Sequence, residues 1–111
     1  MVALLIMVAG PYSAPTAEGR ATNLAAMNRA AAEVARRGHI PVIGVNVALP
    51  VLDAAGLPHG HPLMMTVSLA LAARCDGCLQ IGRSPGADRE AELIGSAGHP
   101  VWTSLDEIPN P

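Results

Sequence analysis

The chain has 111 residues and a formal net charge of -2; half of its residues are hydrophobic and 14% are charged. This length fits one small domain. The low charge excludes the basic stripe that marks a nucleic-acid-binding domain, and the hydrophobic content excludes a disordered tail.

The hydrophobic residues are mostly small, because the sequence has 20 Ala, one Tyr, one Trp and no Phe. Small side chains bury less apolar surface per residue than aromatic ones. We therefore expect the chain to bury further surface against copies of itself, as a homodimer or a higher homo-oligomer.

The first predicted element is a strand over residues 2–8, whose continuous apolar run is typical of a strand buried on both faces. The run is too short to span a membrane. No basic residue precedes it and no small-residue cleavage site follows, so it does not resemble a signal peptide. We expect a cytoplasmic protein without membrane association.

A helix follows, which Thr16 can cap and which Gly38 ends after about Arg37. Leu24, Met27, Ala31 and Val34 recur on one face of it. A second strand over residues 40–45 leads into residues 46–62, which contain Pro and Gly and are predicted as a long connection. Connections of this length are usually functional covers or mobile segments.

The remaining predicted elements are a helix over residues 63–74, a strand over 78–82, a helix from Ser84 to Gly98 and a short strand over 101–103. Residues 106–111 are expected to fray. Alternation of strands and helices predicts an α/β domain over residues 1–111, a Rossmann-like three-layer sandwich with a parallel sheet of four or five strands.

Ligands of such sheets bind beyond the carboxyl ends of the strands. Three connections qualify: residues 10–13, the segment from Asn46 onward, and residues 83–86. None carries the glycine pattern of dinucleotide or nucleoside triphosphate sites, and only Tyr12 could stack on a flavin. We expect no cofactor.

Two cysteines, Cys75 and Cys78, form a C-x-x-C pair between a helix and a strand. A redox pair places its first Cys at a helix start instead. A zinc site needs two further ligands, and His59 and His61 do not have zinc-site spacing. Both thiols are predicted to be reduced and buried, and no metal is expected. Asp76, by its position, is predicted to cap or pair structurally.

The turn from Ser84 to Gly86 places free main-chain N–H groups at a helix start, which suits an anion or phosphate. Taken alone, however, this turn is better explained as an ordinary Ser cap followed by Pro, which is common. Glu90 adds a stronger signal, because about 100° of rotation per residue places it on the apolar face of this helix (Ala87, Ala91, Leu93, Ile94, Ala97). An unpaired carboxylate there costs several kcal/mol. It has a raised pKa and favours an active site, unless an Arg or a hydroxyl pairs with it.

These residues together resemble a known family. Four short motifs carry this resemblance: Val8-Ala9-Gly10-Pro11-Tyr12, Arg36-Arg37-Gly38-His39-Ile40-Pro41, Arg74-Cys75-Asp76 and Ser84-x-Gly86-x-x-x-Glu90. The chain is thereby similar to the nucleoside 2-deoxyribosyltransferase-like superfamily, closest to a small uncharacterised branch of it. The resemblance implies a flavodoxin-like sheet with strand order of about 2-1-3-4.

The resemblance also implies cleavage or exchange of the N-glycosidic bond of a nucleoside or nucleoside 5′-monophosphate, with Glu90 attacking the sugar. Gly10, Tyr12, Ser13, Asn46, Ser84 and Gly86 are then expected to bind substrate, and Ser84 suggests a 5′-phosphate. The family has an Asp where this chain has Ser68. Asp53, His59 or His61 could replace it as proton donor, or form a lid. The alternative is a non-catalytic nucleotide or nucleotide-sugar binding module.

Overall fold

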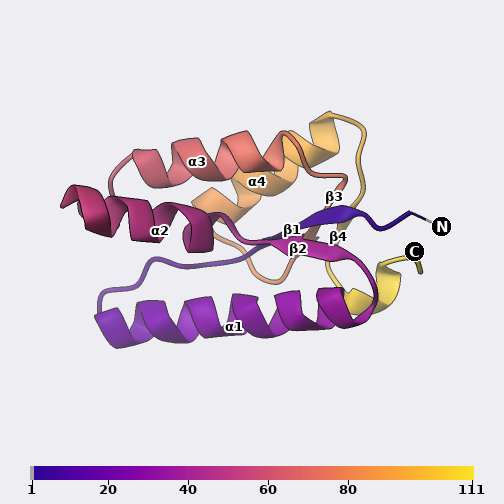
Figure 1. The fold of residues 1–111 in the computed structure, drawn as a ribbon, viewed down its shortest axis with the longest axis horizontal. Helices are drawn as coiled ribbons and strands as arrows, with labels where there is room; N and C mark the ends of the chain where they lie inside the picture. Colours follow the sequence, from indigo (N-terminus) through magenta and orange to yellow (C-terminus); the bar gives the residue numbers. More distant parts are fainter. Residues whose placement is uncertain (1) are drawn as a thin grey trace.

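A computed structural model, which describes residues 2–111, has an α/β fold around four parallel strands (Figure 1). The strands are β1 (Leu5–Ala9), β2 (Ile40–Val42), β3 (Gly77–Gln80) and β4 (Val101–Trp102). They lie in the order β2-β1-β3-β4, as predicted. Residues 2–111 contain four strands and no fifth.

Helices cover both faces of the sheet. α1 (Ala17–Arg36) packs on β1 and β2, and α4 (Pro85–Ser96) packs on β1 and β3. α3 (Leu63–Ala72) packs on α4, and α2 (Gly44–Ala55) packs on α3. In Figure 1, α1 lies below the sheet and α3 and α4 lie above it, which gives three layers. A short 3-10 helix, η1 (Leu105–Glu107), follows β4.

Strand β1 is the centre of the hydrophobic core, because its side chains alternate between the two faces of the sheet. Ile6 and Val8 pack with Met27 and Val34 of α1 on one side. Met7 and Ala9 pack on the other side with a smaller set from α3, β3 and α4 (Ala72, Cys78, Ala87, Ala91, Ile94). The alanines of this second layer let α4 lie close to the sheet.

The strands point their carboxyl ends to the left in Figure 1. Here α2 and the first turns of α1 and α3 extend past the sheet. The segments that follow the parallel strands therefore begin at the same edge of the sheet, which is where the sequence predicts a ligand site.

Two predicted helix starts are confirmed by their caps. The Thr16 hydroxyl accepts a hydrogen bond from the Gly19 N–H at 3.0 Å. The Ser84 hydroxyl accepts one from the Ala87 N–H at 3.1 Å. Each cap satisfies one of the N–H groups that a helix start leaves without a partner.

The prediction of a strand through residue 45 and a long connection after it was wrong, because residues 44–55 form α2. Pro50 inside the segment argued against a helix, since proline removes one main-chain hydrogen bond. Pro50 is exposed, and Val45, Ala48 and Leu52 form a buried face whose packing outweighs that cost.

The prediction that residues 106–111 fray was also wrong. Ile108 is buried, and the Arg37 guanidinium donates to the Leu105 carbonyl at 2.8 Å. The buried His39 ring accepts a hydrogen bond from the Leu4 N–H at 3.0 Å, and its other nitrogen lies 2.6 Å from the Pro109 carbonyl. The ring therefore connects the segment before β1 with the tail after β4.

Other predictions about individual residues can be compared directly. Asp76 is structural as predicted, because its carboxylate accepts the Leu5 N–H at 2.8 Å. Cys75 and Cys78 are buried free thiols, and burial raises their pKa values to about 11 and about 12. Leu93 and Ala97 were assigned to the buried face of α4 but are exposed. None of the helices in residues 2–111 is long and apolar enough to cross a membrane.

Candidate functional site

A cavity of about 400 Å³ lies at the carboxyl edge of the sheet. The segments after β1, β2 and β3 line it, together with α3 and the connection before α3. Seven of the ten residues proposed from the sequence line this cavity: Gly10, Tyr12, Ser13, His59, Ser84, Gly86 and Glu90. The fold therefore brings together residues that lie up to 80 positions apart.

Glu90 lines the cavity from the second turn of α4 and is only 8% exposed. Burial raises the pKa of its carboxyl from an ordinary 4.5 to about 7. Among residues 2–111, no basic group forms an ion pair with it. The structural pair with an Arg that the sequence left open is thus not found in the described chain. The carboxyl is therefore available to a ligand.

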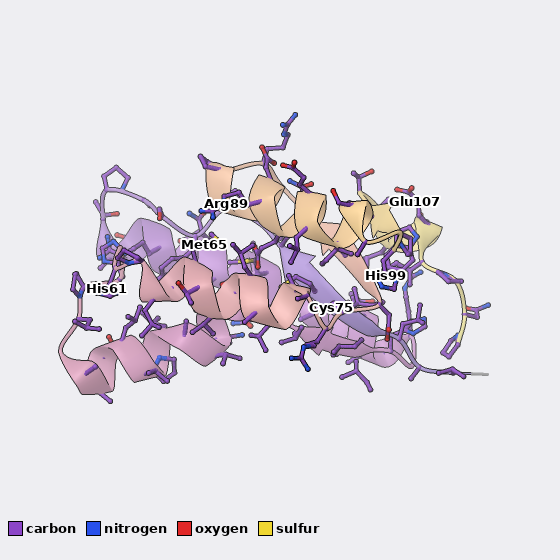
Figure 2. All side chains as sticks on the ribbon, turned by 90° about the horizontal axis from the view of Figure 1, so that it is seen from above. His61, Met65, Cys75, Arg89, His99 and Glu107 are labelled. Atoms are coloured by element: carbon purple, nitrogen blue, oxygen red, sulfur yellow. The ribbon has the colours of Figure 1, made fainter. Side chains whose placement is uncertain are left out.

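The cavity wall is otherwise almost free of charge. Its lining contains no Lys and no Arg, and apolar contributions come from Val8, Met27, Met64 and Met65. Figure 2 shows Met65 between α3 and α4. Its methyl group packs so closely on Gly86 that a Cβ there would lie 2.8 Å away. A ligand here would contact a largely apolar wall with one carboxyl group, that of Glu90.

The start of α4 retains fewer free N–H groups than the sequence suggested. The Ser84 hydroxyl already binds the Ala87 N–H, and Pro85 has none. The Gly86 N–H remains for a ligand, together with the proton of the Ser84 hydroxyl. Arg83, the basic residue before this turn, pairs with Asp88 at 3.0 Å, and neither residue lines the cavity.

Tyr12 and His59 meet edge to face, with ring centroids 6.4 Å apart. Tyr12 follows β1, and His59 belongs to the connection between α2 and α3. The Asn23 side chain donates to the Tyr12 carbonyl at 3.0 Å and fixes this loop on α1. The two rings, which come from different connections, therefore form one continuous part of the cavity lining.

Three residues proposed from the sequence do not line the cavity. Asn46 is exposed on α2 and donates to the Asn28 side chain at 2.7 Å. Asp53 is exposed near the far end of α2, about 13 Å along the helix axis from the cavity end. The His61 ring accepts a hydrogen bond from the Leu63 N–H at 3.0 Å, just before α3.

The cavity is also lined by residues that the sequence did not indicate, among them Ile43, Gly44 and Val45 at the start of α2. The sequence predicts a strand and a connection for this segment, and therefore does not assign these residues to the site. The helical spacing of Val45, Ala48 and Leu52, followed by a glycine at residue 56, is the sequence signal that could have revealed this helix.

Ser68 of α3 also lines the cavity and is only 4% exposed. It faces the start of α2 so closely that a Cβ on Gly44 would overlap its hydroxyl oxygen. No protein-family model matches the chain, and no curated protein matches it. The site is therefore interpreted from its own chemistry.

Proposed function

We propose that this protein cleaves the N-glycosidic bond of a nucleoside or a nucleoside 5′-monophosphate, with Glu90 as the nucleophile. The observation that carries the proposal is the buried Glu90 carboxyl, which lines a cavity at the carboxyl edge of the sheet without an ion-pair partner in residues 2–111. Isolated carboxyls in such positions are typical of active sites.

In the proposed reaction, an ionised Glu90 oxygen forms a bond to the sugar C1′ as the bond from C1′ to the base nitrogen breaks. The electron pair of that bond leaves with the base, which takes up a proton. Water then attacks C1′ and gives one proton to the solvent, which balances the proton taken up by the base. The C1′–oxygen bond to Glu90 breaks, the carboxylate is regenerated, and the free sugar or sugar phosphate departs. If a second base attacks instead of water, the outcome is transfer.

The cavity wall supports a ligand with an apolar ring and a polar end. Tyr12 and His59 offer ring surfaces for a base or sugar. Ser84 and the Gly86 N–H would hold the 5′ end, at the positively polarised start of α4. Since no Lys or Arg lines the cavity, a 5′-phosphate would be held by neutral donors only.

Ser68 favours a second candidate, a non-catalytic nucleotide or nucleotide-sugar binding module. A hydroxyl stands where the family that the sequence resembles has a carboxylate to assist the departing base. General acid assistance contributes a factor of about 10²–10⁴ in rate. A site without it would bind the same ligands and turn them over slowly or not at all.

Release of free base from a panel of nucleosides and their 5′-monophosphates tests the first candidate. We expect release by the wild type, none by Glu90→Gln, and unchanged release by Glu92→Gln, which removes an exposed carboxylate two residues along the same helix. If no compound releases base, but calorimetry shows that wild type and Glu90→Gln bind nucleotides equally well, the binding module is the correct function.

A further inference from the structure

The start of α2 has main-chain donors that the protein itself does not use. The residue before the helix is Ile43, whose side chain cannot accept a hydrogen bond, so α2 begins without a side-chain cap. Within residues 2–111, neither the Gly44 N–H nor the Val45 N–H donates a main-chain hydrogen bond. Both residues are buried and both line the cavity.

Unused donors in a buried position are unusual. More than nine in ten buried N–H groups in proteins have a partner, and leaving one without a partner costs free energy. At the starts of α1 and α4, the hydroxyls of Thr16 and Ser84 each accept one of the first N–H groups, whereas no side chain does so at the start of α2. α2, with 12 residues, is long enough to concentrate positive potential at the same end.

Ser68 is an independent observation that points to a ligand at this place. Its side chain is more than nine-tenths buried, lines the cavity and contacts Gly44. Its hydroxyl makes no hydrogen bond with residues 2–111, and since no fully buried side-chain oxygen there lacks a partner, this oxygen remains accessible from the cavity. The nearby Thr66 hydroxyl, in contrast, donates to the Pro62 carbonyl at 3.1 Å. Three donors without a partner in residues 2–111 therefore belong to neighbouring residues of the cavity lining: the N–H groups of residues 44 and 45, and the Ser68 hydroxyl.

We propose that the start of α2 and Ser68 form a subsite for an acceptor oxygen, and that this oxygen is an exocyclic carbonyl of the departing base. This rests on the proposed function. When the C1′–N bond breaks, its electron pair stays on the base and spreads onto that carbonyl oxygen. Donors already aimed at the oxygen stabilise the growing charge, as in an oxyanion hole.

The subsite also explains how the chain manages without the carboxylate that Ser68 replaces. Hydrogen bonds to the carbonyl oxygen stabilise the anion of the base, which makes the base a better leaving group. The base can then depart as an anion and take its proton from water afterwards. A carboxylate at residue 68 would repel that anion unless it were protonated. The preferred substrates are therefore oxo bases such as hypoxanthine and uracil, rather than adenine, which has no carbonyl.

Calorimetry with hypoxanthine and adenine tests the subsite without requiring turnover. The two bases share a ring system and differ in an oxo or an amino group at one carbon. An amino group there would leave buried donors facing another donor, so we expect hypoxanthine to bind at least about tenfold more tightly. Ser68→Ala should reduce this preference severalfold.

A matched pair of variants tests the main-chain donors. Ile43→Thr introduces a side-chain cap that occupies the N–H groups at the start of α2, whereas Ile43→Val has nearly the same shape and no hydroxyl. We expect the threonine variant to lose most of the preference for hypoxanthine, and the valine variant to keep a larger share. Circular dichroism confirms that both variants are folded.

Equal affinity for the two bases, a preference for adenine, or no binding of either at millimolar concentration would overturn the proposed subsite. So would an identical base preference in the threonine and valine variants. A hypoxanthine preference in a protein that releases no base would support the subsite and contradict the proposed cleavage, so the two proposals fail separately.

Discussion

The buried Glu90 carboxyl lowers the stability of the fold, although the proposed reaction needs it. Burial raises its pKa to about 7, so the folded protein holds a proton that the unfolded chain releases near 4.5. Since the unfolded state binds fewer protons between these values, stability falls as the pH rises through that interval. The ionised carboxyl therefore costs the fold roughly 3 kcal/mol above pH 7.

Replacement of Glu90 by glutamine should remove this pH dependence. We expect Glu90→Gln and the wild type to differ little in free energy of unfolding at pH 4, and the variant to be more stable by up to roughly 3 kcal/mol at pH 8. Urea denaturation at several pH values measures the difference. A gap that does not grow with pH, or one that grows equally in Glu92→Gln, would contradict the assigned burial.

The position of Glu90 could be predicted from the sequence, whereas the hydrogen bonds of other polar residues could not. The angular position of Glu90 on a helix with alanines follows from spacing alone. The hydrogen bonds of His39 and Asn46 depend on residues 70 and 18 positions away, which spacing does not reveal.

The helices that have a side-chain cap and a helical pattern of apolar residues were predicted correctly. The helix that lacks a cap and contains a proline was not. α1 and α4 begin at a Thr and a Ser whose hydroxyls cap them. α2 has no side-chain cap and contains Pro50, and its stability comes from packing on α3. The part of the site built on α2 was missed for this reason.

The buried His39 ring is one of the contacts that hold the tail after β4, beside the buried Ile108 and the Arg37 hydrogen bond to Leu105. We expect His39→Ala to reduce the free energy of unfolding by about 1–3 kcal/mol, because the Leu4 N–H loses its acceptor. Hydrogen exchange should also accelerate in residues 105–111. His99→Ala is the control, since His99 follows a helix-ending glycine in the same way but is exposed. Equal effects of the two substitutions would show that the ring does not hold the tail.

At the scale of the whole molecule, the surface is uneven in charge. Residues 43–73, which include α2 and α3, contain one charged side chain, Asp53, apart from two histidines. Val47 and Val51 are about half exposed on α2, at 44% and 52%. An uncharged face can meet its own copy across a two-fold axis without repulsion, so we propose that the chain forms homodimers through α2.

Light scattering coupled to size-exclusion chromatography measures this association. We expect a dimer for the wild type and a monomer for Val51→Glu, because each copy would then bury a carboxylate in the contact. Arg29→Glu on α1 is an exposed control that leaves the α2 face unchanged. A wild-type monomer at all concentrations, or a dimer that Val51→Glu does not affect, would contradict the proposal.

Covalent capture by Glu90 is the central claim, and mass spectrometry of the protein after incubation with 2′-fluoro-2′-deoxynucleosides tests it most directly. Fluorine at C2′ destabilises the oxocarbenium-like transition states, and water therefore releases the trapped sugar slowly. We predict that the fluorinated sugar adds to the wild type, with the extra mass on the peptide that contains Glu90, and that Glu90→Gln remains unmodified. Base release without any adduct on this peptide, or an adduct that persists in Glu90→Gln, would contradict the claim.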